Sequence, residues 1–261
     1  MEYWYKNTIA IVGILLLAII LEYLKKSRTK NMFEVNDIKN ELPSIGSVLL
    51  IIAHPDDEIM FWTPTIVALT SNNIQMKILC LSNGNYDGLG EKREIEFDNV
   101  SRALNFPYNK ILDIPELQDN IKKYWEPSIV SEQIEEFLKY NEDVKTIITF
   151  DEKGVTKHPN HISCYNGLQY YLKKHSNECK NKGIKIYALD SFNFFLQYSI
   201  LFPLLKGLFN RYSYFLLTFF NSYKWMRLYE TQFNLLRKAH VILSSYSYIN
   251  SFTKIDYSKL Y

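Results

Sequence analysis

The apolar run SVLLIIA, residues 47–53, is typical of a strand that is covered on both faces of a sheet. Similar short runs recur along the chain at residues 76–81, 110–114, 146–150 and 185–189. Segments with helical character separate these runs, at residues 58–71, 91–105, 127–140 and 160–174. Strands that alternate with helices imply right-handed crossovers. The sequence therefore predicts an α/β fold with a Rossmann-like, doubly wound and mostly parallel sheet.

The composition excludes several classes of protein. The chain has 261 residues, of which 47% are hydrophobic and 22% charged, so it can bury a core and is not globally disordered. A formal net charge of +2 argues against a dedicated nucleic-acid-binding protein, which normally carries a basic face. Three scattered cysteines are too few for a disulfide scaffold or a zinc finger, and they fit a reducing compartment.

The N-terminal segment is predicted to be a membrane anchor. No charged residue lies between Lys6 and Glu22, and the centre of this stretch is the apolar run IAIVGILLLAIIL. The basic cluster KKSRTK follows directly, which is the wrong side for a cleaved signal peptide. We therefore expect a single transmembrane helix within residues 1–30, with the rest of the chain on the cytoplasmic side. Residues 31–46 would form a tether, and residues 47–261 one folded domain.

A cluster of polar and ionisable residues follows the first predicted strand: His54, Pro55, Asp56, Asp57 and Glu58. In open α/β sheets, ligands bind beyond the carboxyl ends of the strands. Imidazole and carboxylate groups bind zinc, and a catalytic zinc site takes three protein ligands and leaves a position for water. One of two adjacent aspartates can bind metal while the other accepts a proton from water, and the residues alone do not say which. The plain alternative is an aspartate helix cap beside a solvated glutamate.

A second cluster follows the predicted strand at residues 146–150. It reads DEKGVTKHPNH, and its two histidines, His158 and His161, flank a proline that can begin a helix. One histidine can complete a metal site while the other faces a substrate. The alternative is a pair of histidines in a surface loop. His175 and His240 lack such a setting, and we interpret them as surface or packing residues.

The third segment is a glycine-rich loop, SNGNYDGLGEKRE, at residues 82–94. It lacks both the GxGxxG pattern and the lysine of a P-loop, so a nucleotide site is not predicted. A loop that leads into a helix N-terminus instead lets a sugar or a phosphate approach the backbone. Arg93, one turn into that helix, is the candidate substrate-binding residue, although helical arginines are usually only solvated.

Together these segments resemble the PIG-L family of N-acetylglucosaminyl-phosphatidylinositol de-N-acetylases. The resemblance rests on LIIAHPDDEIMFWTPTI, SNGNYDGLGEKREIE and FDEKGVTKHPNH, in this order, and extends weakly to LLRKAHVILSSYSYINSF near the C-terminus. It implies a zinc-dependent amidohydrolase with His54, Asp57 and His161 as metal ligands. By the same resemblance, Asp56 is the general base and His158 stabilises the oxyanion.

The resemblance also implies a substrate. It predicts hydrolysis of the N-acetyl group of N-acetylglucosaminyl-phosphatidylinositol, a membrane glycolipid, to glucosaminyl-phosphatidylinositol and acetate in the second step of GPI-anchor biosynthesis. The expected location is the cytoplasmic face of the endoplasmic reticulum membrane. Two alternatives are the same chemistry on a soluble N-acetylglucosaminide and a membrane scaffold with a vestigial site. Where family members often carry His-x-Ser-Gln, this chain has Tyr229-Glu230-Thr231-Gln232, which bears on substrate contacts and leaves the metal ligands intact.

Aromatic residues make up 15% of the chain and gather at residues 192–223. Only Lys206 and Arg211 are charged in this stretch, and Pro203 and Gly207 interrupt it. The stretch is compatible with two buried helices or with a hairpin in the membrane interface, where aromatic side chains sit among lipid headgroups. Because an enzyme that acts on a glycolipid needs such a surface beside its pocket, the second interpretation predicts a membrane contact.

Overall fold

The computed structural model describes residues 12–13, 16–17, 19, 46–106, 108–199, 201–210, 212–216 and 219–256. The predicted membrane anchor and tether therefore lie outside the described residues, apart from Gly46 and five helical positions near the N-terminus. In the part of the chain that is described, no helix combines the length and the apolar character needed to cross a membrane.

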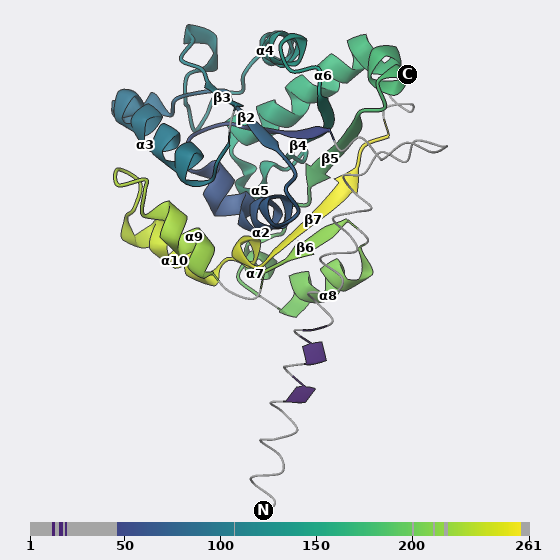
Figure 1. Cartoon of the computed structure of the whole chain (residues 1–261). Coiled ribbons are helices and arrows are strands. Elements are labelled where there is room, and N and C mark those ends of the chain that lie inside the picture. Colours follow the sequence, from purple (N-terminus) through teal and green to yellow (C-terminus); the bar gives the residue numbers. More distant parts are fainter. Residues whose placement is uncertain are drawn as a thin grey trace, which may run out of the picture.

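A seven-stranded sheet forms the centre of the fold, in the order β3-β2-β1-β4-β5-β7-β6 (Figure 1). The strands are β1 (Ser47–Ile52), β2 (Met76–Cys80), β3 (Tyr108–Ile111), β4 (Val144–Phe150), β5 (Lys185–Leu189), β6 (Ser213–Phe215) and β7 (Ile249–Lys254). β1 to β5 pair in parallel, whereas β7 pairs antiparallel with β5 and with β6. The five predicted strands are confirmed. The prediction of a mostly parallel sheet did not include the antiparallel extension through β7 and β6, which makes the sheet mixed.

Four long helices connect the parallel strands, and each matches a predicted segment. They are α2 (Asp57–Ser71), α3 (Gly90–Ala103), α4 (Pro127–Lys139) and α6 (Pro159–Asn181). Shorter helices follow β4, β5 and β6: α5 (Gly154–Lys157), α7 (Phe194–Gln197), α8 (Leu201–Phe209), α9 (Phe220–Met226) and α10 (Leu235–Leu243). Three turns of 3₁₀ helix are η1 (Asn85–Asp87), η2 (Pro115–Leu117) and η3 (Ser245–Ser247).

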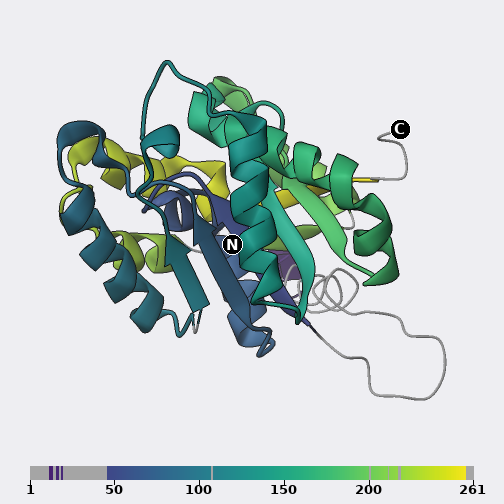
Figure 2. The ribbon, with the colours of Figure 1, turned by 90° about the horizontal axis from the view of Figure 1, so that it is seen from above.

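Helices cover both faces of the parallel part of the sheet. In Figures 1 and 2, α4 and α6 lie over one face, and α2 and α3 lie over the other. β1 is central, between β2 and β4, and its residues 48–52 are fully buried. Because both faces of β1 are covered, its sequence is apolar at successive positions instead of alternating. This winding brings the carboxyl ends of the parallel strands, with their polar loops, to one edge of the sheet.

The aromatic segment of residues 192–223 does not form a pair of buried helices. It contains α7, α8, β6 and the beginning of α9. Tyr214 and Phe215 of β6 are buried, whereas Phe195 of α7 and Phe209 of α8 are 84% and 90% exposed. Part of the aromatic side chains therefore belongs to the core, and part faces solvent.

A close contact between α4 and α6 yields a test of the packing. Gly167 of α6 lies so near α4 that a Cβ there would overlap the side chain of Val130, which is fully buried. We expect Gly167→Ala to lower the free energy of unfolding by about 1–3 kcal/mol, because the two helices must separate to admit the methyl group. Chemical denaturation would measure it.

Asn177→Ala is the matched control, because Asn177 lies on the same helix and is exposed. Its effect should stay within about 0.5 kcal/mol. Equal stability of the two variants would show that α4 and α6 are not in close contact at Gly167.

Candidate active site

The turn after β1 arranges the first cluster of polar side chains. Asp57 begins α2, and its Oδ2 accepts hydrogen bonds from the backbone N–H groups of Ala53 and His54, at 3.1 and 2.9 Å. Asp56 precedes the helix in the left-handed region, with φ of 95°, a conformation that costs energy for a non-glycine residue. The turn thus holds Asp57 in place and sends the two aspartate side chains in different directions.

Three buried side chains converge at this turn. Ligand atoms of His54, Asp57 and His161 all lie within 4.8 Å of one another. His161, in the first turn of α6, places its Nε2 3.2 Å from Asp57 Oδ1. His54 places its Nδ1 3.8 Å from Asp57 Oδ2. These are the three residues predicted as metal ligands, and their donor set of two imidazoles and one carboxylate suits a divalent ion.

The second nitrogen of each imidazole ring also has a polar partner. His161 Nδ1 lies 3.1 Å from the carbonyl oxygen of Gly154, and Phe150 stacks on the same ring at 4.2 Å. His54 Nε2 lies 3.1 Å from both Asp119 Oδ1 and Asn160 Oδ1. Metal-binding histidines commonly donate their second N–H to a carboxylate or a backbone carbonyl, which fixes the tautomer and the ring. The surroundings of both histidines therefore fit a divalent metal.

Asp119 is a site residue that the sequence did not reveal. It lies beyond η2, in the loop after β3, and its side chain is only 10% exposed. Burial works to raise the pKa of this carboxyl group, but the hydrogen bond to His54 and the charges of His54 and Arg93 outweigh burial and lower the pKa. Asp119, His54 and His158 also form a second, shallower group of potential ligands within 4.8 Å. The only signal in the sequence was position after a predicted strand.

Two arginines hold the carboxylate of Asp56. Arg237 Nε lies 2.7 Å from Asp56 Oδ2, and Arg93 Nη2 lies 3.5 Å from Asp56 Oδ1. Arg93 is 6% exposed and donates to the carbonyl oxygens of Pro55 and Gly84, at 2.5 and 2.9 Å. Arg93 is thus not a solvated helical arginine. Arg237, from α10, lies in the weakly matching segment LLRKAHVILSSYSYINSF, but it was not singled out as a site residue.

The glycine-rich loop makes room for Arg93. Gly84 has φ of 70°, in the left-handed region, and a Cβ at this position would overlap the Arg93 guanidinium. Only glycine therefore satisfies both the backbone conformation and the close approach of the arginine. The loop supports the site through Arg93, in addition to lining it with Tyr86, Asp87 and Leu89.

His158 caps the N-terminus of α6. Its Nδ1 accepts a hydrogen bond from the backbone N–H of Asn160 at 3.2 Å. Burial, together with the neighbouring His161 and His54, lowers the pKa of His158 to about 4. The ring is therefore neutral near pH 7, and because Nδ1 is an acceptor, its proton is on Nε2. His158 can thus donate a hydrogen bond without carrying a charge.

Asp151 anchors the loop that carries His158 and His161. Its Oδ1 accepts from the backbone N–H of Gly154 at 3.0 Å, and its Oδ2 accepts from that of Ser191 at 2.8 Å. The first residue of the DEKGVTKHPNH segment is therefore a structural tie between the ends of β4 and β5. It holds in place the Gly154 carbonyl that contacts His161.

Tyr229 occupies the position where the family element has its histidine. It is fully buried, and its hydroxyl donates to Glu58 Oε1 at 2.5 Å. Glu58 Oε2 in turn accepts from the backbone N–H of Asp56 at 3.2 Å. Burial raises the pKa of Glu58 to about 8, although the hydrogen bond from Tyr229 acts in the opposite direction. Tyr229 therefore supports the turn from behind, while the next residues, Thr231 and Gln232, line the pocket.

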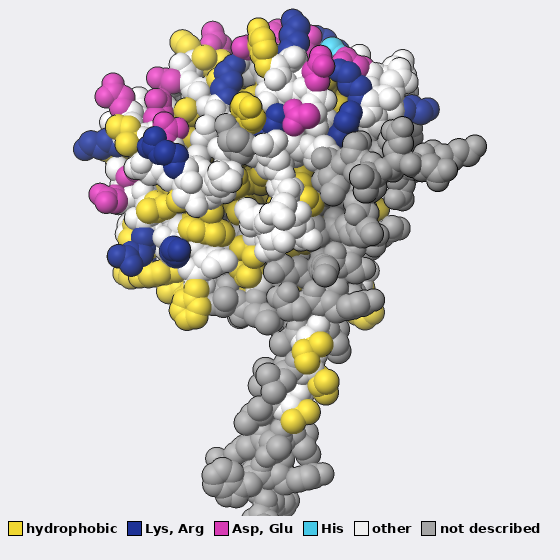
Figure 3. Space-filling model, viewed as in Figure 1, with side chains coloured by type: hydrophobic (Ala, Val, Ile, Leu, Met, Phe, Trp, Pro, Cys, Tyr) yellow, Lys and Arg dark blue, Asp and Glu magenta, His cyan; other side chains and the backbone are white. Residues whose placement is uncertain are grey.

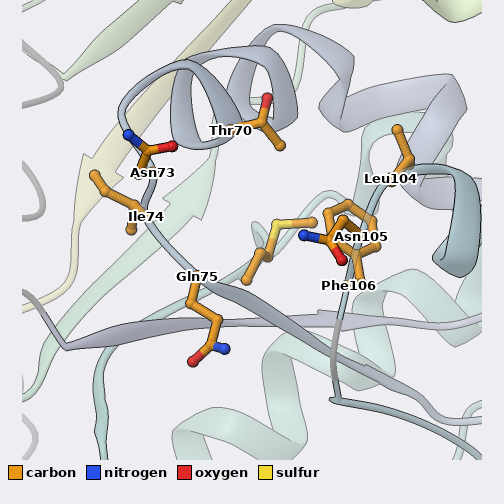
Figure 4. Close-up of a pocket in the computed structure, with 8 residues that line it drawn as sticks. Thr70, Asn73, Ile74, Gln75, Leu104, Asn105 and Phe106 are labelled. Carbon is orange, nitrogen blue, oxygen red and sulfur yellow. The ribbon is translucent and has the colours of Figure 1, made fainter.

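All six predicted site residues line one pocket of about 390 Å³: His54, Asp56, Asp57, Arg93, His158 and His161. Another hollow, of about 420 Å³, lies near the opposite end of α2 and is drawn in Figure 4. Its lining includes Thr70, Gln75, Leu104 and Phe106 but no ionisable side chain. Only the first of these two hollows has groups that can bind a metal or transfer a proton.

Comparisons with known proteins agree with this arrangement. A family model described as PIG-L, GlcNAc-PI de-N-acetylase, matches residues 49–171. A protein of Schizosaccharomyces pombe named probable N-acetylglucosaminyl-phosphatidylinositol de-N-acetylase is 39% identical over 59% of this chain and 61% of its own length. The Dictyostelium discoideum protein of the same name is 33% identical over 80% of this chain and 93% of its own. The Bos taurus N-acetylglucosaminyl-phosphatidylinositol de-N-acetylase is 32% identical over 80% and 84%.

Among solved structures, the N,N'-diacetylchitobiose deacetylase of Pyrococcus horikoshii shares the fold. Its TM-score is 0.58 at 13% identity, and the match covers 83% of this chain and 86% of that one. At this identity the likeness concerns the fold alone. The Dictyostelium and Bos taurus relatives align over most of both chains at more than 30% identity, and the family model covers the HPDDE and HPNH segments. The chain therefore belongs to the PIG-L family.

Proposed function

We propose that this chain is an N-acetylglucosaminyl-phosphatidylinositol de-N-acetylase. It hydrolyses the acetamide of this glycolipid to glucosaminyl-phosphatidylinositol and acetate, the second step of GPI-anchor synthesis. The observation that carries the proposal is the meeting of His54, Asp57 and His161 with Asp56 and His158 in one pocket. Relatives with the corresponding name align over most of the chain and support the substrate.

His54, Asp57 and His161 would hold the metal, and we propose Zn²⁺, which accepts this set of nitrogen and oxygen ligands. When bound, a zinc ion lowers the pKa of water toward about 7 and polarises a carbonyl group. Asp57 is the metal ligand of the aspartate pair in this proposal, because its Oδ1 faces His161 while its Oδ2 is held by two backbone N–H groups. Asp56 is outside the group of converging ligands.

Asp56 serves as the general base. Its carboxylate lines the pocket and is fixed by Arg237 and Arg93, so it is positioned to accept a proton from the attacking water. His158 donates its Nε2–H to the oxyanion that develops from the acetamide carbonyl. Arg93 and Asp119, both in the pocket, offer a donor and an acceptor to sugar hydroxyls.

Membrane association and topology belong to the same proposal. Residues 1–30 would anchor the chain in the endoplasmic reticulum membrane, residues 31–46 would act as a tether, and residues 47–261 would form the catalytic domain. The basic cluster that follows the apolar stretch favours a cytoplasmic catalytic domain.

The activity can be tested with purified full-length chain and the glycolipid. We expect release of acetate that stops when a chelator removes the metal and returns when Zn²⁺ is added back, because His54, Asp57 and His161 would hold the metal that activates the water. A soluble N-acetylglucosaminide is assayed in parallel, to test whether the enzyme requires the lipid part of the substrate. Full activity of a metal-free preparation would contradict the metal dependence of the reaction. If the purified chain showed neither bound metal nor turnover, a scaffold with a vestigial site would be favoured.

The roles of the two aspartates, Asp56 and Asp57, can be distinguished by substitution. Asp57→Asn should lower the bound zinc per chain, because an amide oxygen replaces a carboxylate in a three-ligand site. Asp56→Asn should retain zinc and lose about 10²–10⁴-fold in kcat with little change in KM, because only the base is removed. Metal analysis beside turnover measures both. A metal-free Asp56→Asn with a zinc-loaded Asp57→Asn would reverse the assignment.

Topology can be tested in sealed microsomes. Because the basic cluster favours the cytosolic side, added protease should digest an epitope at the C-terminus while a lumenal marker stays intact. Permeabilised microsomes serve as the control for protease access. Protection of the epitope until the membrane is opened would place the catalytic domain in the lumen.

A further inference from the structure

Three short helices carry apolar side chains that are largely exposed. We call them the apolar surface: Phe194 and Phe195 of α7, Leu205 and Phe209 of α8, and Leu235, Leu236 and Leu243 of α10, with exposed fractions between 45% and 90%. Single exposed apolar residues are ordinary on soluble proteins, but a group of phenylalanines and leucines on neighbouring elements marks a binding surface. The sequence had drawn attention only to the part within residues 192–223.

The three helices are adjacent in space. α7 contacts α8, and the hydroxyl of Tyr198, directly after α7, lies 3.4 Å from Nδ1 of His240 in α10, so the three helices lie next to one another. Figure 1 places these helices along the lower side of the molecule, and Figure 3 shows hydrophobic side chains along the same side. The apolar surface is therefore one face rather than three separate patches.

The charged residues around this face are mostly basic, although Lys206 pairs with Asp190, Nζ to Oδ2 at 3.0 Å. Residues 192–243 contain six lysines and arginines and one carboxylate, Glu230. Lys206 of α8 and Lys224 of α9 are exposed, and the Asp and Glu side chains that are visible in Figure 3 lie mostly in the upper part of the view, away from this face. Apolar side chains combined with lysine and arginine suit the interface of a bilayer that contains anionic lipids. A partner protein would have to match the shape of this face as well as its apolar and basic character. An anionic bilayer has to match only the apolar and basic character.

The apolar surface adjoins the active-site pocket. Asn234 and Arg237 line the pocket, and the two residues between them, Leu235 and Leu236, are each 80% exposed. The first turn of α10 thus belongs to both the rim of the pocket and the apolar surface. A lipid whose acyl chains stay in a bilayer beneath α10 would have its headgroup next to the pocket.

We propose that the apolar surface of α7, α8 and α10 lies on the interface of an anionic phospholipid bilayer and seats the mouth of the pocket against the membrane. This inference rests on the proposed function, because it assigns the face through which a membrane glycolipid enters. It is additional to the N-terminal anchor, since it concerns contacts of the folded domain itself.

Depth measurements on the full-length chain test the surface without any turnover. The three native cysteines are buried, so a cysteine introduced at Leu236 or at Phe209 can be labelled selectively with a fluorophore. The chain is reconstituted in vesicles of phosphatidylcholine and phosphatidylinositol that contain a spin-labelled quencher lipid. We expect quenching at both positions and none at Tyr140, a matched control that is 83% exposed beyond α4.

The anchor alone would hold the domain near the vesicle, so the comparison between positions is decisive. Equal fluorescence at Leu236, Phe209 and Tyr140 would overturn the proposal and would leave the apolar surface to a protein partner. Quenching that is the same without phosphatidylinositol would overturn the anionic part of the proposal.

A charge substitution provides a second readout. Phe195→Glu with Phe209→Glu should raise KM for glycolipid in vesicles by about tenfold, since two negative charges oppose an anionic interface. Hydrolysis of a short-chain, water-soluble analogue should remain unchanged, because neither residue lines the pocket. Tyr140→Glu is the control for added charge. Normal vesicle kinetics in the double variant would overturn the docking surface while the deacetylase stands; selective quenching in a chain without deacetylase activity would overturn the proposed function alone.

Discussion

The carboxylate of Asp57 is the group on which the active-site end of the sheet depends. It is buried, it binds two backbone N–H groups at the end of β1, and it faces His161. Burial alone would raise the pKa of this carboxyl group, but the nearby His161 and His54 hold the pKa well below its usual range. A carboxylate that stays ionised in the interior needs a cation, and two imidazoles with a divalent metal between them would provide it.

The surrounding groups give the three consecutive acidic residues, Asp56, Asp57 and Glu58, different environments. Asp57 faces the histidines, Asp56 is held by Arg237 and Arg93, and Glu58 points into the interior to Tyr229. Because burial raises the pKa of Glu58 to about 8, this third side chain is mostly neutral near pH 7 and adds little repulsion. The tyrosine in place of the family's histidine is thus part of the support for the turn. Among the described residues, the Tyr229 hydroxyl is the one hydrogen-bond donor to Glu58 Oε1.

The sequence predicted what local patterns determine. The apolar runs marked the parallel strands, and the HPDDE and HPNH segments marked the pocket, because their residues lie where strands end. Asp119 reaches the same pocket from the loop after η2 and Arg237 from the helix α10, and no feature of the sequence singled out either residue. β7 was missed for another reason: its residues Asn250 and Ser251 are polar, yet both are buried. Asn250 bonds to Thr65 of α2, and Ser251 to Ser213 of β6, so tertiary hydrogen bonds replace the apolar pattern.

The two parts of the fold divide the work of the site. The segments that follow the parallel strands β1 and β4 supply His54, Asp57 and His161, which we propose hold the metal. The segment after β5 supplies the exposed apolar surface and Arg237, and these meet the chemistry at one point, the 2.7 Å contact between Arg237 Nε and Asp56 Oδ2. The helix that we propose faces lipid therefore also contacts Asp56, the proposed base. Since α10 begins at Leu235, a shift of this helix displaces Arg237 with it, and the orientation of Asp56 depends on where α10 rests. In the proposed arrangement, contact of α10 with the membrane and the position of Asp56 are linked through the ion pair between Arg237 and Asp56.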